Sequence, residues 1–140
     1  MNLEQIYTEL IREHNKSPIN KEEMKDATVS ERGHNPSCGD DIILHLKIEN
    51  NIILKASFTG VGCAISQAST SMMIELIEGK SLEEAEELLE VFLKMIRKEA
   101  EDEELEKLGD AIVLQNISNM PARVKCGTLP WHTLKIAIEK

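Results

Sequence analysis

The sequence is poor in aromatic residues and contains no long apolar run. Only four of its 140 residues are Phe, Trp or Tyr, so a core must be built from Leu, Ile, Val, Ala and Met. No purely apolar stretch exceeds five residues, far short of the about 20 that a transmembrane helix needs. The first residues also lack a basic segment followed by an apolar one, so no secretory signal is expected. We therefore expect no membrane partner.

Basic residues are scarce as well, and the cysteines are odd in number. The chain has 16 Lys and Arg against 25 Asp and Glu, a net charge of -9. Such an acidic protein is a poor ligand for the phosphate backbone, so no nucleic-acid partner is expected. Three cysteines cannot all pair within one chain, which favours the reducing cytoplasm. The length predicts a single domain over residues 1–140.

The negative charge is concentrated in residues 81–107. This segment holds eleven acidic and four basic residues, a net charge of -7, and leaves -2 for the rest of the chain. Ser81 followed by Glu84 matches a capping box. Apolar residues then recur at helical spacing: Leu82, Ala85, Leu88, Leu89, Phe92, Met95 and Ile96. The segment is predicted to be helical with a solvated charged face; the alternative interpretation is an acidic docking surface for a basic partner.

A different periodicity, typical of strands, precedes this segment. Residues 41–49 alternate apolar and polar, and residues 52–58 do so again, with Leu54, Ala56 and Phe58 expected on one face. Between them, Asn50 and Asn51 tolerate positive φ and suit a two-residue hairpin turn. Residues 28–32 can supply a third strand. The pattern predicts a three-stranded antiparallel sheet with at least one half-buried face.

Three further segments have the spacing of helices. The first carries Leu3, Ile6, Tyr7, Leu10 and Ile11, and the second carries Ile65, Ala68, Met72 and Leu76 and ends at Gly79. The last is expected to begin at about Thr128 with Pro130 in its first turn, where a missing N–H is harmless. Helices and strands in this order predict an α+β fold with the helices packed on one face of the sheet.

Each cysteine lies at a predicted break between elements and beside a glycine. Cys38 lies in a loop between two strands, Cys63 lies between the hairpin and a helix, and Cys126 lies just before the last helix. A helix N-terminus favours the thiolate, which is the nucleophile of sulfur chemistry and a ligand of soft metals. Neighbouring glycines let backbone N–H groups approach the sulfur. The placement is typical of thiols that act in chemistry.

Asp40, two residues after Cys38, can add an oxygen to the three sulfurs. Such a set suits tetrahedral zinc or a mixed iron site. The spacing matches no short zinc-finger pattern, so two other interpretations stay open: unrelated structural thiols, or a cysteine nucleophile with His34 or His132 as its base. His45 is placed on a strand with no obvious partner.

Three ordered motifs, residues 35–40, 60–69 and 123–126, resemble the iron–sulfur assembly proteins of the IscU/SufU family over nearly the whole chain. The resemblance is to the SufU-type branch, because Lys125 stands where IscU-type members have histidine. The acidic segment 81–107 also lies where SufU-type members carry an insertion. The leucine–proline–proline–valine–lysine motif that engages a chaperone in IscU-type proteins is absent, and residues 120–123 read Met-Pro-Ala-Arg instead.

The resemblance implies an IscU-like fold and a metal site made by Cys38, Asp40, Cys63 and Cys126. In SufU-type proteins such a site holds zinc and takes sulfur from a cysteine desulfurase of the SufS type, which makes a persulfide with pyridoxal phosphate. Cys38 would accept this sulfur and relay it into cluster biogenesis, so the protein would act as a sulfur acceptor rather than a stand-alone enzyme. Arg123 and Lys125 would stabilise thiolate charge or contact the partner.

The same family also implies an alternative function. The ligands would hold iron and sulfide as a transient [2Fe–2S] cluster for delivery to apo iron–sulfur proteins or a downstream scaffold. In IscU-type scaffolds replacement of the aspartate that matches Asp40 slows cluster release, while Lys125 removes one iron ligand and favours sulfur relay. A purely structural zinc module is a third interpretation, although a carboxylate ligand favours an exchangeable site.

Overall fold

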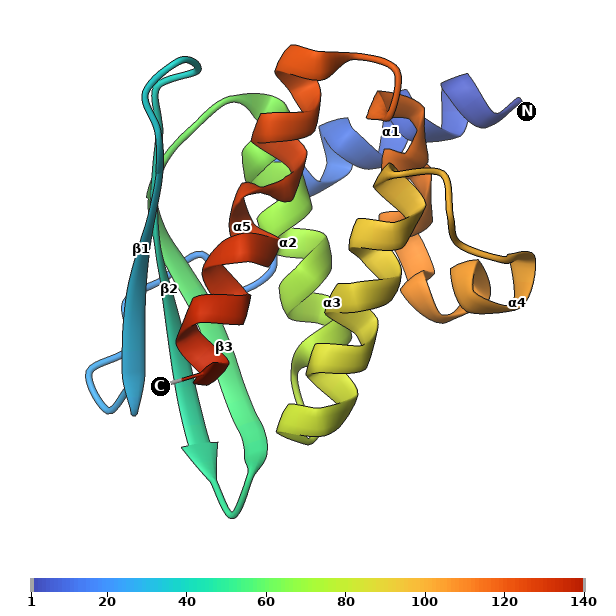
Figure 1. The fold of residues 1–140 in the computed structure, drawn as a ribbon. Helices are drawn as coiled ribbons and strands as arrows, with labels where there is room; N and C mark the ends of the chain where they lie inside the picture. The colour runs from blue at the N-terminus through green and yellow to red at the C-terminus, as the bar shows by residue number, and fades with distance from the viewer. Residues whose placement is uncertain (1, 140) are drawn as a thin grey trace.

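The computed structural model describes residues 2–139, except for the side chain of Leu3. Leu3 was predicted to belong to the apolar stripe of the N-terminal helix, and this part of the prediction lies outside the described residues. A three-stranded sheet forms one layer, and the helices form a second layer over one of its faces (Figure 1). The elements are α1 (Leu3–Lys16), β1 (Val29–Asn35), β2 (Asp40–Glu49), β3 (Ile52–Val61), α2 (Ala64–Ile77), α3 (Leu82–Ile96), α4 (Asp102–Leu105), the 3-10 segment η1 (Glu106–Ile117) and α5 (Pro121–Glu139). The predicted α+β fold is confirmed.

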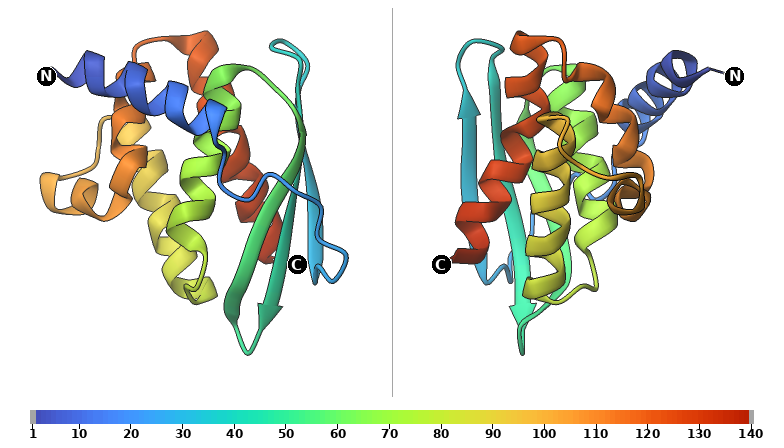
Figure 2. Two further views of the ribbon diagram at one scale, coloured as in Figure 1. Left: turned by 180° about the vertical axis from the view of Figure 1, so that it is seen from behind. Right: turned by 45° about the vertical axis from the view of Figure 1, so that its right-hand side comes forward.

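The sheet has the order β1-β2-β3 and is antiparallel throughout, as the alternating patterns predict. Both views of Figure 2 show the long β2–β3 hairpin projecting beyond the helices. Asn50 and Asn51 form its turn with φ of 52° and 63°, the left-handed values expected of this pair. Asn35 pairs with Asp40 across the β1–β2 turn, which places the Cys38 loop at the opposite end of the sheet from this hairpin turn.

The predicted inner face of β3 is wrong at Leu54, which is 46% exposed. The register shifts where Lys47 pairs with Lys55 and Ile48 pairs with Ile53, so Leu54 is an extra residue on β3. One inserted residue reverses the side-chain alternation beyond it. Ile53 is therefore fully buried in place of Leu54, while Ala56 and Phe58 face inward as predicted.

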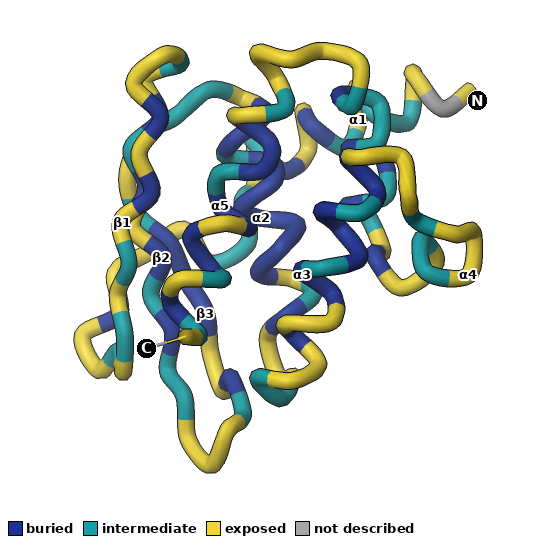
Figure 3. The backbone as a smooth tube through the Cα atoms, in the orientation of Figure 1, coloured by how far each residue is buried: buried dark blue, intermediate teal, exposed yellow. Residues whose placement is uncertain are grey.

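The core lies between the sheet and helices α2, α3 and α5, where the buried backbone of Figure 3 is concentrated. As the composition predicts, it consists mainly of aliphatic residues and methionine. Two of the few aromatic residues meet in it: the rings of Phe92 and Trp131 stack with centroids 4.1 Å apart. None of the helices within residues 2–139 is long and apolar enough to span a membrane.

The acidic segment 81–107 is helical only in part. The capping box of Ser81 and Glu84 starts α3 as predicted, but α3 ends at Ile96. There the N–H groups of Lys98 and Glu99 bond to the carbonyls of Met95 and Lys94, a Schellman motif with Lys98 at φ 64°. Lysine occupies the position where glycine is usual, so no glycine marks this helix end in the sequence.

The last helix begins earlier than predicted. α5 starts at Pro121, whose missing N–H is harmless in the first turn, and continues through Pro130 in its interior. Since Pro130 has no N–H, the carbonyl of Cys126 lacks its usual helical partner four residues on. Because α5 begins at Pro121, Cys126 lies in the second turn of this helix and is fully buried; it was predicted to lie in a loop before the helix.

Candidate metal centre

Three of the four predicted ligands come together where the β1–β2 turn meets the start of α5. The ligand atoms of Cys38, Asp40 and Cys126 all lie within 4.8 Å of one another. The sulfurs of Cys38 and Cys126 are 2.8 Å apart although the residues are 88 positions apart in the chain, and both are free thiols. The fold thus converges two sulfurs and a carboxylate on one point.

Asp40 is held in an orientation that leaves one oxygen facing the sulfurs. Its side chain is fully buried because it is the first inward-facing residue of β2. Oδ1 accepts the N–H of Cys63 at 2.8 Å and the hydroxyl of Ser66 at 3.0 Å. From the described residues Oδ2 accepts only a longer bond of 3.4 Å, from Asn35, whose amide also lies 4.0 Å from the sulfur of Cys126. Oδ2 is therefore the oxygen available to a metal ion.

Cys63, the fourth predicted ligand, adjoins this group but is not part of the 4.8 Å cluster. It is the N-cap of α2, as predicted, and its sulfur accepts the N–H of Ser66 at 3.4 Å. Its own N–H bonds to Asp40, which ties the start of α2 to the start of β2. The structure thus brings Cys63 to the same end of the sheet, with its sulfur fixed by the helix terminus.

Gly62 allows this junction to close. A Cβ at this position would lie 2.4 Å from Oγ of Ser66 and 3.0 Å from Oδ1 of Asp40. Any side chain would therefore displace the hydroxyl that anchors the carboxylate. Gly39, in the turn after Cys38, is required for a different reason, since its φ of 69° is left-handed.

The prediction that a helix N-terminus would favour a thiolate at Cys126 is wrong. Burial raises the pKa of this thiol above its ordinary value, and hydrogen bonds to Cys38 and Cys63 and the negative charges of Cys63 and Asp40 act in the same direction. The physical reason is that Cys126 lies in the second turn of α5, buried and away from the helix end. A bound cation would reverse this preference.

Arg123 and Lys125 are exposed on the first two turns of α5, and neither side chain donates a hydrogen bond to a described residue. The pKa of Tyr7 on α1 is raised, mainly by burial. The positive charge of Arg123 opposes this rise, and the charge of Cys63 adds to it. The two bases thus lie on the same helix turns as Cys126, exposed and without an ion pair among the described residues.

Sequence reasoning missed three residues of this environment: Tyr7, Asn35 and Ser66. Ser66 is detectable in principle, because it lies three residues after an N-cap. Asn35 lies within a recognised motif, but its contact with Asp40 follows only from the strand register. Tyr7 belongs to an apolar helical stripe in the sequence, and nothing in this pattern indicates that it lies near Cys63 and Arg123.

The histidines do not join the cysteines. His34 and His132 are exposed and make no hydrogen bond to a cysteine among the described residues, which gives no support to a cysteine–histidine nucleophile. His45, for which the sequence suggested no partner, bridges Ser30 at 2.8 Å and Thr59 at 3.0 Å across the three strands.

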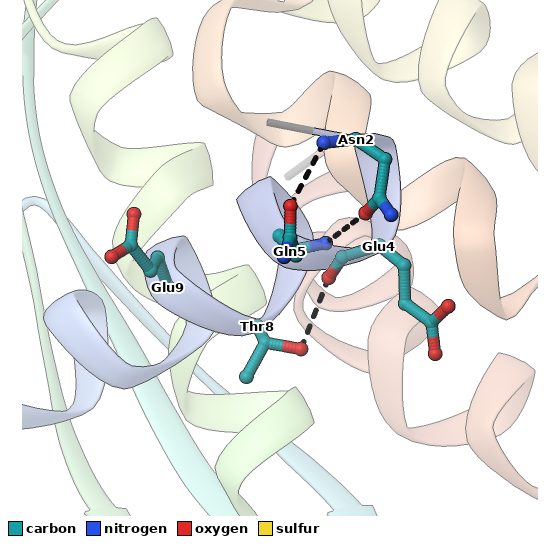
Figure 4. A pocket seen from close by; sticks show the side chains of 5 residues that line it. All are labelled: Asn2, Glu4, Gln5, Thr8 and Glu9. Carbon is teal, nitrogen blue, oxygen red and sulfur yellow. Dashed lines mark hydrogen bonds between the residues drawn. The ribbon is translucent and has the colours of Figure 1, made fainter.

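A surface hollow lies elsewhere, along the first turns of α1 (Figure 4). It is lined by Asn2, Glu4, Gln5, Thr8 and Glu9, and the hydrogen bonds drawn there belong to the capping box of α1 and its first turn. These bonds serve the helix start, so this hollow contributes nothing to the cysteine site.

The fold and this site define a class: small α+β proteins that carry cysteines and an aspartate at one end of a three-stranded sheet. Residues 6–127 match the family described as NifU-like N terminal domain, and the chain belongs to this family.

Its relatives carry the names that the motifs suggest. The chain is 46% identical to the iron–sulfur cluster assembly scaffold protein IscU of Thermotoga maritima, over 96% of this chain and 94% of that one. It is 40% identical to the zinc-dependent sulfurtransferase SufU of Bacillus subtilis, over 99% and 93%. The crystal structure of a putative SUF-system scaffold from Fervidobacterium islandicum superposes with a TM-score of 0.88, at 40% identity, over 96% and 97%. The resemblance to the IscU/SufU family is confirmed.

Proposed function

We propose that this protein is a zinc-bound sulfur acceptor of cytoplasmic iron–sulfur cluster assembly, which takes persulfide sulfur from a SufS-type cysteine desulfurase. Cys38, Asp40, Cys63 and Cys126 would hold the metal, and Cys38 would accept the sulfur. The observation that carries this proposal is the convergence of Cys38, Asp40 and Cys126 within 4.8 Å, with Cys63 bonded to Asp40. The zinc-dependent sulfurtransferase among the relatives supports it.

The residues present fit zinc. Three thiols and one carboxylate are donors that this ion accepts in a four-coordinate site. Asp40 is buried with one oxygen anchored and the other available, which is the arrangement expected of a carboxylate that contacts a cation. When bound, zinc would keep these thiols deprotonated at neutral pH, against the burial that raises the pKa of Cys126.

Cys38 is the thiol best placed to meet a donor. It is half-buried in a turn whose neighbours Ser37 and Gly39 are exposed, whereas Cys126 is buried and Cys63 is fixed by its cap. The thiolate of Cys38 attacks the terminal sulfur of the donor persulfide. The donor's S–S bond breaks, a persulfide forms on Cys38 and the donor cysteine leaves as a thiolate, with no net oxidation.

Arg123 and Lys125 would assist this transfer. Their exposed, unpaired cations stand on the helix turns next to Cys126 and add positive potential where thiolate charge develops. They also offer contacts to a partner that approaches Cys38.

A second candidate function is a scaffold for a transient [2Fe–2S] cluster that passes to apo-proteins. It is favoured by the name of the relative at 46% identity, which is a cluster assembly scaffold. The donors would be the same, with the cluster as cargo.

Two assays, run side by side, test the proposal. With desulfurase, cysteine and a mild reductant, the zinc-loaded protein should raise sulfide production, and brief incubation without reductant should add the mass of one sulfur atom to the peptide that contains Cys38. Cys38→Ala should abolish both, while Ser37→Ala, its exposed neighbour, should leave both unchanged. Absence of sulfur on Cys38, together with a visible cluster that passes to an apo-ferredoxin, would establish the scaffold function instead.

A further inference from the structure

A second cluster of metal-ligating side chains lies where α1, α2 and η1 pack together, apart from the cysteine site. The ligand atoms of His14, Glu75 and Asp110 all lie within 4.8 Å of one another. Glu75 is twelve residues after Cys63, so along α2 it lies roughly 18 Å from the helix start. None of the predicted cysteine-site ligands belongs to this group.

His14 is oriented from outside the cluster. It is buried, at 4% exposure, and its Nδ1 lies 2.7 Å from Oγ of Ser71, which also accepts the N–H of Ile19 at 2.8 Å. Without an ion, the contact with Asp110 places the proton on Nε2; with an ion bound, Nδ1 donates to Ser71 and the lone pair of Nε2 faces the metal. A histidine whose second ring nitrogen is fixed by a hydrogen bond is the usual form of a metal ligand.

Two carboxylates are brought together beside His14, and no Lys or Arg of the described residues forms an ion pair with either of them. Asp110 contacts Nε2 of His14 at 3.1 Å, and Glu75 makes no hydrogen bond or ion pair with a described residue. Lys80 and Lys107 line the same surface cleft as Glu75, but the ion pair of Lys107 is with Glu87. Like charges this close repel one another unless a cation lies between them.

The chain is bent in order to place Asp110. Gly109 has a φ of 54° and interrupts η1, so the residue after it turns toward α1 and α2. Asp110 is 41% exposed and Glu75 is exposed, so an ion can enter from solvent. The imidazole of His14 thus forms the buried wall of the site, and the two carboxylates line its solvent-facing side.

We propose that His14, Glu75 and Asp110 form a second, solvent-exchangeable site for a divalent first-row metal ion such as Mn²⁺, Fe²⁺ or Zn²⁺. One imidazole nitrogen and two carboxylate oxygens suit these ions, and water completes the coordination. The bound ion ties the end of α1 to α2 and η1. It therefore stabilises the packing of the N-terminal helix, independently of sulfur transfer.

Manganese is the probe, because it prefers oxygen and imidazole over the thiols of the first site. The full chain, loaded with one equivalent of zinc, is titrated with Mn²⁺ while free Mn²⁺ is followed by electron paramagnetic resonance. One Mn²⁺ should bind saturably, broaden the ring-proton signals of His14 and raise the melting temperature. Glu75→Gln should weaken binding by about tenfold or more and remove the rise in melting temperature.

Glu86→Gln is the matched control, since it removes the same charge from an exposed position on α3. It should leave Mn²⁺ affinity unchanged. Equal weakening by both substitutions would overturn the site and leave only diffuse attraction to an acidic surface. Unsaturable binding, or saturation without broadening of His14, would also overturn it. Zinc content and sulfur transfer are not read in this experiment, so its failure is distinct from failure of the proposed function.

Discussion

At the scale of the residue, Gly62 is the position where a single added methyl group should disturb the cysteine site most. The added Cβ of Gly62→Ala would collide with Ser66 and press on Asp40. We expect a loss of stability of about 1–3 kcal/mol and a marked fall in zinc affinity, because the carboxylate must move. Urea unfolding and competition with a chromogenic chelator measure the two effects.

Ser66→Ala supplies the control for this prediction. It removes the hydroxyl that the new Cβ would meet, and it also removes one hydrogen bond to Asp40. In the Ser66→Ala background, Gly62→Ala should therefore cost less than it does alone. Additive effects of the two substitutions would show that the collision is not the cause.

His45 gives the molecule a pH dependence on the acid side of neutrality. Partial burial lowers the pKa of His45. His132 keeps access to solvent, but partial loss of hydration and the positive charge of Lys135 lower its pKa too, so the unfolded chain binds more protons than the folded one. The free energy of unfolding should thus fall as pH drops through the ordinary histidine pKa of about 6.5, and recover above it. Urea unfolding between about pH 5 and pH 8 measures this slope.

Histidine replacement identifies the source of the slope. His45→Gln and His132→Gln together should flatten this part of the curve relative to the parent, since the proposed metal site is common to both proteins and its contribution cancels in the comparison. The carboxylates of Asp26, Asp41, Glu84 and Glu104, whose pKa values are lowered by hydrogen bonds, act in a separate window near pH 4 and below. An unaltered slope in the double variant would contradict the assignment.

At the scale of the element, the end of α3 stores strain at a single residue. Lys98 adopts a left-handed φ of 64° that glycine accepts more readily. Lys98→Gly should stabilise the protein by about 1 kcal/mol relative to Lys98→Ala. Both variants lose the side-chain bond to Asn119, so the difference between them isolates the backbone effect. Chemical unfolding of the pair measures it, and equal stability would contradict the strain argument.

The elements also show what sequence patterns reveal and what they conceal. The hairpin at Asn50 and Asn51 and the start of α3 at Ser81 were predictable because local side-chain chemistry determines both. The exposure of Leu54 and the early start of α5 were not, because each depends on contacts far along the chain. A bulge is a property of the paired strand, and Pro130 is tolerated within α5 although proline usually ends a helix.

Some features of the candidate site were also predictable from the sequence and others were not. Cys38, Asp40, Cys63 and Cys126 could be named from the sequence because thiols beside glycines and the family motifs mark them. The anchoring of Asp40 by Ser66 and the placement of Asn35 could not, since both arise from strand register and helix position. The burial of Cys126 could not either, because it depends on where α5 begins.

At the scale of the whole molecule, the proposed zinc would join three parts of the chain that the core already holds in place. The hydrophobic cluster runs through the sheet, α2, α3 and α5. It includes Cys126, but aliphatic residues and methionine make up most of it, so the fold should survive removal of the metal. We expect a strong chelator to lower the melting temperature by several degrees, because an ion that binds only the folded state stabilises it by mass action.

Trp131 reports whether the core is kept when the metal leaves. It is fully buried in the core, where it stacks on Phe92 and donates its ring N–H to Ser69 at 3.0 Å. Near-ultraviolet circular dichroism of this ring should therefore be the same before and after chelation, while the melting temperature falls. Cys126→Ser should lower the melting temperature in zinc and make it insensitive to chelator. Loss of the tryptophan signal on chelation would show instead that the metal holds the fold together, as in a structural zinc module.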